Sequence, residues 1–173
     1  MRTRSLLLAV LFSITVPAMA AEKIVVINLI NESGIGKPIG TIKLSDSATG
    51  LVLDPDLGEL PPGPHGFHIH ENPSCAPGEK DGKKGAGLAA GGHFDPEQSS
   101  KHEGPGGHGH HGDLPLLVVK PDGSMTQPLT APRLKVEQLT GRSIMIHEGG
   151  DNYRDTPKPL GGGGGRIACG VIE

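Results

Sequence analysis

The sequence predicts an all-β protein built as an antiparallel sandwich or barrel. Seven short runs are rich in Val, Ile and Leu, and each is bounded by Gly, Pro, Asn or Asp, which is the pattern of strands joined by turns. Glycine (28) and proline (16) are abundant and fall between these runs. No long stretch has helical periodicity, so many short strands at short spacing favour a sandwich or barrel.

The expected strands follow one another from residue 23 to residue 172. Their sequences are KIVVINLI, GTIKL, GLVLDPDL, HGFHIH, LPLLVVK, SIMIHE and RIACGVI. The segment KPDGS is expected to turn, because Pro121 presets its φ and Gly123 supplies a positive φ. The segment APRLKVEQLTG is expected to form at most about one helical turn. Val, Ile and Leu must form the core, since the only aromatic residues after position 20 are Phe67, Phe94 and Tyr153.

The first twenty residues are expected to be a cleaved secretory signal. Arg2 and Arg4 precede an apolar run over residues 6–16, and the small residues of 18–20 supply a cleavage site. A membrane anchor is the alternative, but this run is shorter than the roughly 20 residues that span a bilayer. We therefore expect export without membrane insertion, with the mature chain starting near Ala21.

Residues 21–173 are long enough for a single domain with a sizeable core. Without Arg2 and Arg4 the 16 basic residues become 14, against 19 acidic residues, which gives a net charge of −5. The sequence has no basic stripe, RNA motif or aromatic stacking platform, so no nucleic-acid partner is expected.

Cys75 and Cys169 are the only cysteines of the chain. In an exported protein an even number of cysteines predicts a disulfide, and two buried free thiols are the alternative. The bond would close a loop of about 94 residues, which the chain-entropy model values at ~4–5 kcal/mol. It would also attach the last strand to a central loop.

Two long connections, residues 71–115 and 149–165, have little strand character. Connections of this length inside a compact domain are uncommon and usually functional. Both are dense in His, Asp, Lys and Gly. We expect the chemistry of the protein to lie there.

Histidines at the ends of expected strands predict a metal site. His68 and His70 alternate on one strand, so both imidazoles share a face while Ile69 points to the core. An isolated pair is more often a polar strand face, but that interpretation weakens when His147, at the end of another expected strand, and His93, which follows a Gly-Gly pair, are counted. Imidazoles without a ligating cysteine suit copper or zinc, and Cu(II) binds the more tightly.

A second group offers nitrogen and carboxylate ligands suited to tetrahedral zinc. It consists of His102, one or more histidines of 108–111, and Asp113. The residue types alone leave open which of the adjacent His110 and His111 would bind, and whether the tract is only a low-complexity metal-binding segment. They predict an exported β-protein with one or two histidine-rich metal sites.

Several motifs resemble the copper/zinc superoxide dismutases, specifically their exported bacterial branch. The motifs are GFHIHENPSC, AGGHFDP, HGDLP, APRL, GGDN and GGGGGRIACGVI, and the resemblance runs from about Gly66 to the end and more weakly back to Lys23. It implies a Greek-key antiparallel β-barrel of about eight short strands with two long functional loops. It also implies a periplasmic enzyme that protects the cell envelope by converting superoxide to oxygen and hydrogen peroxide through copper redox cycling.

The resemblance implies one copper and one zinc ion per subunit. The copper ligands would be His68, His70, His93 and His147. The zinc ligands would be His93, which bridges the two metals, and His102, His110 and Asp113. His110 is favoured over His111 because it lies eight residues after His102 and three before Asp113.

Further residues acquire roles from the same resemblance. Asp151 would accept hydrogen bonds from ligands of both metals and fix their orientation. Arg166 would attract the superoxide anion beside the copper, and His93 would take up a proton when copper is reduced and deliver it to the next substrate. Cys75 and Cys169 match the disulfide of the family. Lys80, Lys83 and Lys84 match a loop whose lysines guide the anion, and a merely solubilising loop is the alternative.

Two questions remain open at this point. An exported copper or zinc buffer on the same scaffold is the rival function, although a metal store would not need His147 and Arg166 at their places. The family contains both monomers and dimers, so the sequence allows a homodimer without requiring it.

Overall fold

The computed structural model describes residues 21–173, and the predicted signal segment, residues 1–20, lies outside them. The described residues contain eleven strands: β1 (Glu22–Asn31), β2 (Gly34–Ser47), β3 (Gly50–Leu57), β4 (Gly63–His65), β5 (Phe67–His70), β6 (Gly78–Lys80), β7 (Lys83–Gly85), β8 (Leu117–Val119), β9 (Leu129–Ala131), β10 (Arg142–His147) and β11 (Arg166–Ile172). Three short 3₁₀ helices accompany them: η1 (Leu88–Ala90), η2 (Val136–Gln138) and η3 (Leu160–Gly162). The all-β prediction is confirmed.

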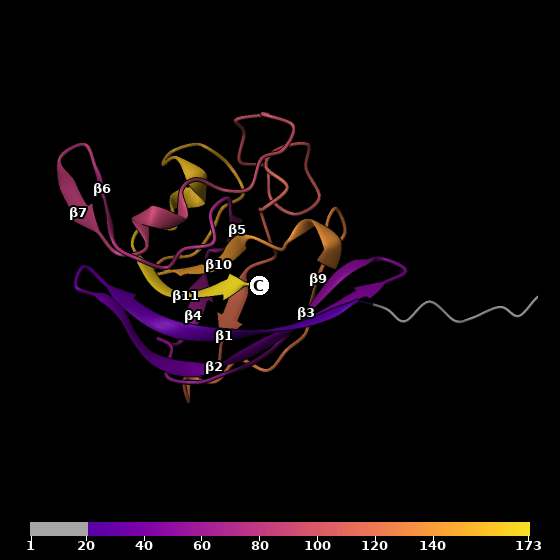
Figure 1. Cartoon of the computed structure of the whole chain (residues 1–173). Coiled ribbons are helices and arrows are strands. Elements are labelled where there is room, and N and C mark those ends of the chain that lie inside the picture. Colours follow the sequence, from indigo (N-terminus) through magenta and orange to yellow (C-terminus); the bar gives the residue numbers. More distant parts are fainter. Residues whose placement is uncertain (1–20) are drawn as a thin grey trace, which may run out of the picture.

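Seven strands form one antiparallel sheet in the order β5-β10-β11-β1-β2-β3-β9. Figure 1 shows this sheet curling into a half-barrel, with the long connections gathered at one end. Strands β4 and β8 pair separately, and β6 and β7 form a short hairpin. The last strand, β11, therefore lies inside the sheet, between β1 and β10.

Alternation along the strands separates the core from the solvent. On β1, Val25 and Ile27 are buried, whereas Ile24 and Val26 are exposed. The core consists almost entirely of Val, Ile and Leu, as expected, and Phe67 is its one fully buried aromatic side chain. Each such aliphatic side chain contributes about 1.5–3 kcal/mol when it is buried.

The turn and helix predictions hold. At KPDGS, the Gly123 amide donates to Lys120 O at 2.9 Å, and Gly123 has a φ of 82°. The segment APRLKVEQLTG forms only η2, a single 3₁₀ turn.

The long connection over residues 71–115 is attached to the sheet at the point where the predicted ligands lie. Isolated β-bridges join His68 to Asp113 and His70 to His93, so the loop runs alongside β5. Its hairpin, β6–β7, projects away from the half-barrel (Figure 1). The loop thus carries its side chains to the end of β5.

Cys75 and Cys169 form the predicted disulfide, with their Cα atoms 5.6 Å apart. The bond joins the loop after β5 to the middle of β11. In residues 21–173 we find no helix with the length and apolar character required to cross a membrane.

Candidate metal centre

Four buried histidines converge at the end of the sheet. His68 and His70 lie on β5, His147 ends β10, and His93 comes from the long loop. One ring nitrogen of each lies within 4.8 Å of the others. Ile69, between the first two, packs in the core, as the alternation predicts.

The ring nitrogens of this group fit a metal ion. Among the described residues, Nδ1 of His68 and Nε2 of His70, His93 and His147 are buried without any hydrogen-bond partner. Burying an unpaired polar atom is costly, and such atoms are normally satisfied. Four unpaired imidazole nitrogens close together are the ligand set that copper or zinc prefers.

The opposite nitrogens of three of these rings contact carbonyl or carboxylate oxygens. Nε2 of His68 lies 2.7 Å from Asp151 Oδ2, Nδ1 of His70 lies 2.9 Å from Gly91 O, and Nδ1 of His147 lies 3.3 Å from Gly164 O. Such partners fix the tautomer and the ring orientation of a ligand.

Electrostatics keeps the four rings neutral. Burial lowers the pKa of His68, His70 and His93, and it lowers the pKa of His147 to about 4. The neighbouring histidines lower the pKa values of His68, His70 and His147 further. Because only a neutral imidazole can bind a metal, these rings are ready to bind at neutral pH.

Asp113 is the centre of the second group. Its Oδ1 lies 2.9 Å from Nδ1 of His93, 3.0 Å from Nδ1 of His102 and 3.3 Å from Nδ1 of His110. Three Nδ1 atoms and one carboxylate oxygen make the set that a tetrahedral zinc site takes. His93 belongs to both groups, because its Nδ1 faces Asp113 while its Nε2 faces the other three histidines.

His110 and His111 point to different places. His110 is buried beside Asp113, whereas Nε2 of His111 lies 3.3 Å from Glu97 Oε1, and its ring stands edge-on to Phe94. The group of four around Asp113 whose ligand atoms all lie within 4.8 Å of one another contains His68 in place of His110. We favour His110, since the free Nδ1 of His68 already belongs to the four-histidine group.

The second group holds a proton in the metal-free protein. Burial disfavours charge on His102, but hydrogen bonds to Asp113 and Asp151 outweigh burial and raise its pKa to about 9. Burial likewise opposes ionisation of Asp113, yet the hydrogen bonds from its three histidines keep its pKa well below the usual value.

Asp151 connects the two groups. Its Oδ2 contacts Nε2 of His68 and its Oδ1 contacts Nε2 of His102, both at 2.7 Å. The Tyr153 amide also donates to Oδ1, at 2.7 Å. Gly161 has a φ of 68°, and a Cβ at this position would collide with the carboxylate, so glycine is required there.

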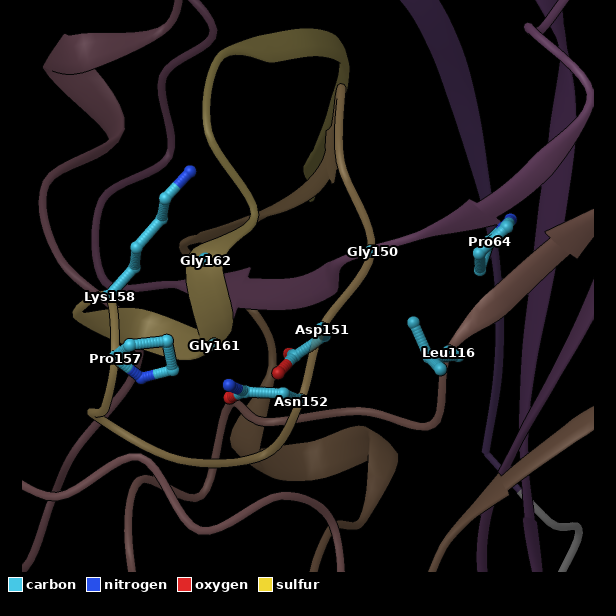
Figure 2. A pocket seen from close by; sticks show the side chains of 9 residues that line it. All are labelled: Pro64, Leu116, Gly150, Asp151, Asn152, Pro157, Lys158, Gly161 and Gly162. Carbon is cyan, nitrogen blue, oxygen red and sulfur yellow. The ribbon is translucent and has the colours of Figure 1, made fainter.

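A cleft of about 400 Å³ lies between the 150–162 segment and Pro64. Figure 2 shows Asp151 among the residues that line it. Lys158 lies at its rim with its ammonium turned away, and Leu116 lies on the opposite side. None of the histidines of the four-histidine group lines this cleft. Within the described residues, the cleft therefore lies next to the metal centre and reaches it only through Asp151.

Arg166 begins β11, and its guanidinium is fixed by two carbonyl oxygens. Nη1 donates to Gly87 O at 2.6 Å, and Nη2 donates to Gly91 O at 2.7 Å. Its charge contributes to the lowered pKa of His70, so it lies within electrostatic reach of the four-histidine group. By contrast, Lys80, Lys83 and Lys84 are exposed on the β6–β7 hairpin.

His65 was missed by the sequence reasoning. Its ring is buried, with Nδ1 2.7 Å from His147 O and Nε2 2.7 Å from Pro61 O. It thereby links the backbone of His147 to the loop before β4. Its presence in HGFHIH gave no sign of this role, because both partners are backbone carbonyl oxygens, which have no residue type of their own.

Comparison with known proteins identifies the family. Residues 39–172 match the family model described as copper/zinc superoxide dismutase. A copper-zinc superoxide dismutase of Salmonella typhimurium is 55% identical over 90% of this chain and 91% of its own length, and one of Escherichia coli K12 is 53% identical over the same shares.

Solved structures give the same result. The copper/zinc superoxide dismutase of Brucella abortus superposes with a TM-score of 0.87 at 51% identity, over 88% of this chain and 100% of its own. The monomeric enzyme of Salmonella enterica gives 0.79 at 55% identity, over the same shares. These relatives favour the enzyme over a metal buffer. The chain belongs to the copper/zinc superoxide dismutase family and is an enzyme that uses copper and zinc to convert superoxide into oxygen and hydrogen peroxide.

Proposed function

We propose that dismutation takes place at the four-histidine group, where His68, His70, His93 and His147 hold the copper. His93, His102, His110 and Asp113 hold the zinc. The observation that carries this proposal is the position of His93, whose two ring nitrogens face the two groups. Bound copper supplies the one-electron chemistry, in which one superoxide is oxidised to oxygen and a second is reduced, with two protons, to hydrogen peroxide.

His93 is the residue that holds and delivers a proton in this proposal. Its Nδ1 lies 2.9 Å from Asp113 Oδ1, which keeps the ring in place whether or not Nε2 is bound. When Nε2 is free it can carry a proton, and the side chain is only 1% exposed, so that proton is shielded from bulk water. His93 then gives the proton to the reduced substrate.

Arg166 attracts and orients the anion. A guanidinium held by Gly87 O and Gly91 O presents its charge at a fixed position, which costs no reorganisation when superoxide arrives. Asp151 contributes by holding the rings of His68 and His102 in a fixed position relative to each other.

The test of this ligand assignment is metal analysis of the mature protein together with a superoxide-removal assay. Residues 21–173 should bind one copper and one zinc. The variant His147→Ala should lose copper and activity while it keeps zinc, because His147 belongs to the copper group alone. Copper retained in full by this variant would contradict the assignment.

Lys80, Lys83 and Lys84 guide superoxide toward the centre. A chain with a net charge of −5 repels anions as a whole, so a local positive patch must produce the attraction. Changing all three lysines to Gln should lower the second-order rate and flatten its dependence on ionic strength, measured by pulse radiolysis. Lys43→Gln, on the outer face of β2, is the control. An unchanged salt dependence in the triple variant would assign the lysines to solubility.

The enzyme is secreted to the periplasm, with cleavage before Ala21. The order of charged, apolar and small residues over positions 1–20 supports this location. N-terminal sequencing of protein released from the periplasm checks it. A mature protein that still begins at Met1 would contradict cleavage.

Homodimerisation has a candidate surface. Ile24, Val26 and Ile35 are 72%, 51% and 57% exposed on the outer face of β1 and β2. A dimer formed there would bury them, and Val26→Glu would then weaken it. Sedimentation equilibrium of both proteins tests this. A wild-type monomer at all concentrations would instead match the monomeric relative of Salmonella enterica.

A further inference from the structure

Arg142, the first residue of β10, has contacts that neither the motifs nor the metal groups explain. Its guanidinium carbon lies 3.6 Å from the centre of the Phe94 ring. Its Nε donates to Gln138 O at 3.0 Å, and its Nη1 donates to Glu71 O at 3.2 Å. The side chain therefore joins three segments that are distant in the sequence.

Two of these contacts lie next to predicted copper ligands. Glu71 follows His70, and Phe94 follows His93. Arg142 itself contacts no predicted ligand, and β10 supplies a third one, His147, at its other end. The guanidinium thus contacts the end of β5 and the long loop on the residues that follow His70 and His93.

Glu71 extends this support to the loop before His93. Its amide donates to Gly92 O at 3.1 Å, and its Oε1 accepts from the Gly92 amide at 2.8 Å. Gly91 has a φ of 77°, and a Cβ at this position would collide with the Glu71 carboxylate. Glu71 and the 91–92 segment are therefore closely packed, and Arg142 holds Glu71 from the other side.

The 91–94 segment, which Glu71 and Arg142 hold, contacts two residues of the proposed site. Gly91 O accepts from Nη2 of Arg166 and also lies 2.9 Å from Nδ1 of His70. His93 follows two residues after Gly91, and the Phe94 amide donates to Ile69 O at 2.8 Å. A shift of residues 91–94 would therefore move the guanidinium of Arg166 and the ring of His93 together.

We propose that Arg142 is a positioning residue of the copper group, which fixes the 91–94 segment through Glu71 and the face of Phe94. An arginine suits this role, because its planar fork donates in two directions while it stacks on an aromatic ring. A lysine keeps the charge and the cation–π contact, but its single ammonium cannot donate to Gln138 O and Glu71 O in the same geometry. This inference rests on the proposed copper group.

The experiment compares wild type, Arg142→Ala and Arg142→Lys, each loaded with copper and zinc. We expect Arg142→Ala to change the Cu(II) electron paramagnetic resonance spectrum. It should also lower kcat/KM up to about tenfold, which is the lower end of the losses seen when a residue that supports a metal ligand is replaced. Arg142→Lys should restore part of both. Lys43→Ala, which removes an exposed charge paired with Glu22, is the matched control and should leave both unchanged.

A second readout uses the metal-free protein. Amide hydrogen exchange at Phe94 should become faster in Arg142→Ala, while exchange at the core residue Ile42 stays as in wild type. Equal acceleration at both amides would mean general destabilisation and would overturn the positioning role.

A wild-type spectrum in Arg142→Ala overturns the inference. If Arg142→Ala does not fold, Arg142→Lys decides: a shifted spectrum supports the inference and a wild-type spectrum overturns it. If wild type itself gives no copper signal that His147→Ala removes, the proposed copper group fails, which is a different result.

Discussion

Arg166 donates a hydrogen bond of 2.7 Å from Nη2 to the carbonyl oxygen of Gly91. The same oxygen lies 2.9 Å from Nδ1 of His70, so one peptide group positions both the proposed anion-binding guanidinium and a proposed copper ligand. The guanidinium proposed to attract superoxide and a ring proposed to hold copper are therefore held by the same peptide group.

The first prediction concerns that guanidinium. Arg166→Ala should retain copper but lower kcat/KM by about tenfold or more, because the local attraction for the anion is lost. Pulse radiolysis with copper analysis measures both quantities. The kcat/KM of Arg166→Lys should lie between the values of wild type and Arg166→Ala, since lysine keeps the charge but lacks the two-pronged planar guanidinium. Turnover equal to wild type in Arg166→Ala would remove its assigned role.

The second prediction separates His110 from His111. His110→Ala should weaken zinc binding by more than about 100-fold, because losing even an outer partner of a ligand costs 10–100-fold. His111→Ala should keep its zinc, since its ring faces Glu97 and Phe94. Competition with a zinc chelator measures both affinities. Equal losses would show that the two histidines exchange as ligands.

The third prediction concerns Asp151. Asp151→Ala frees Nε2 of both His68 and His102, so zinc and copper affinities should each fall about 10–100-fold. Asp151→Asn keeps one acceptor oxygen and should lose less. Isothermal titration of the metal-free variants measures the change. A loss confined to one metal would show that the carboxylate does not connect the two groups.

The fourth prediction is the pH dependence of stability in the metal-free protein. His147 has a pKa of about 4 when folded and ~6.5 when unfolded, so the unfolded state binds more protons between these values and stability rises with pH. His102, with a folded pKa of about 9, stabilises fully below ~6.5 and loses that contribution as the pH rises to 9.

These two effects predict a maximum near pH 6.5, with the depressed pKa values of Asp113 and Asp151 adding to the acid-side loss. Urea unfolding of the metal-free protein at pH 4.5, 6.5 and 8.5 measures it. His102→Gln should flatten the alkaline side and leave the acid side in place. Stability that rises steadily from pH 6.5 to 9 would contradict the proposed charge on His102.

The fifth prediction concerns the disulfide. Replacing Cys75 and Cys169 by Ser should lower the free energy of unfolding by about 2–5 kcal/mol, because the bond constrains a long loop of the unfolded chain. Denaturant titration measures the loss in zinc- and copper-loaded protein. A change below ~1 kcal/mol would show that strand pairing already holds the loop.

Much of the fold was predictable because strands and turns leave local patterns. Alternation along His68-Ile69-His70 placed Ile69 in the core, and Pro121 with Gly123 marked a turn. The spacing of the family's zinc ligands, carried over through the resemblance, favours His110 over His111, and its role as a ligand stays a prediction. In such cases a few neighbouring residues determine the outcome.

Other parts of the site could not be predicted, because their partners are backbone atoms far along the chain. His65 reaches the carbonyl oxygen of His147, and Arg142 reaches that of Glu71. Asp155 accepts from the amide of His102, 53 residues away. A carbonyl or an amide has no residue type of its own, so such contacts leave no motif.

The place of β11 inside the sheet sets the order in which the molecule can be assembled. Its neighbours β1 and β10 lie at opposite ends of the sequence, so the sheet remains in two pieces until residues 166–172 have been made. Pairing between the distant segments β1 and β11 is slow, and the two parts of the sheet can join only after β11 has been synthesised. A stop codon before Arg166 would remove a central strand and divide β5–β10 from β1–β2–β3–β9, leaving two exposed strand edges open to aggregation.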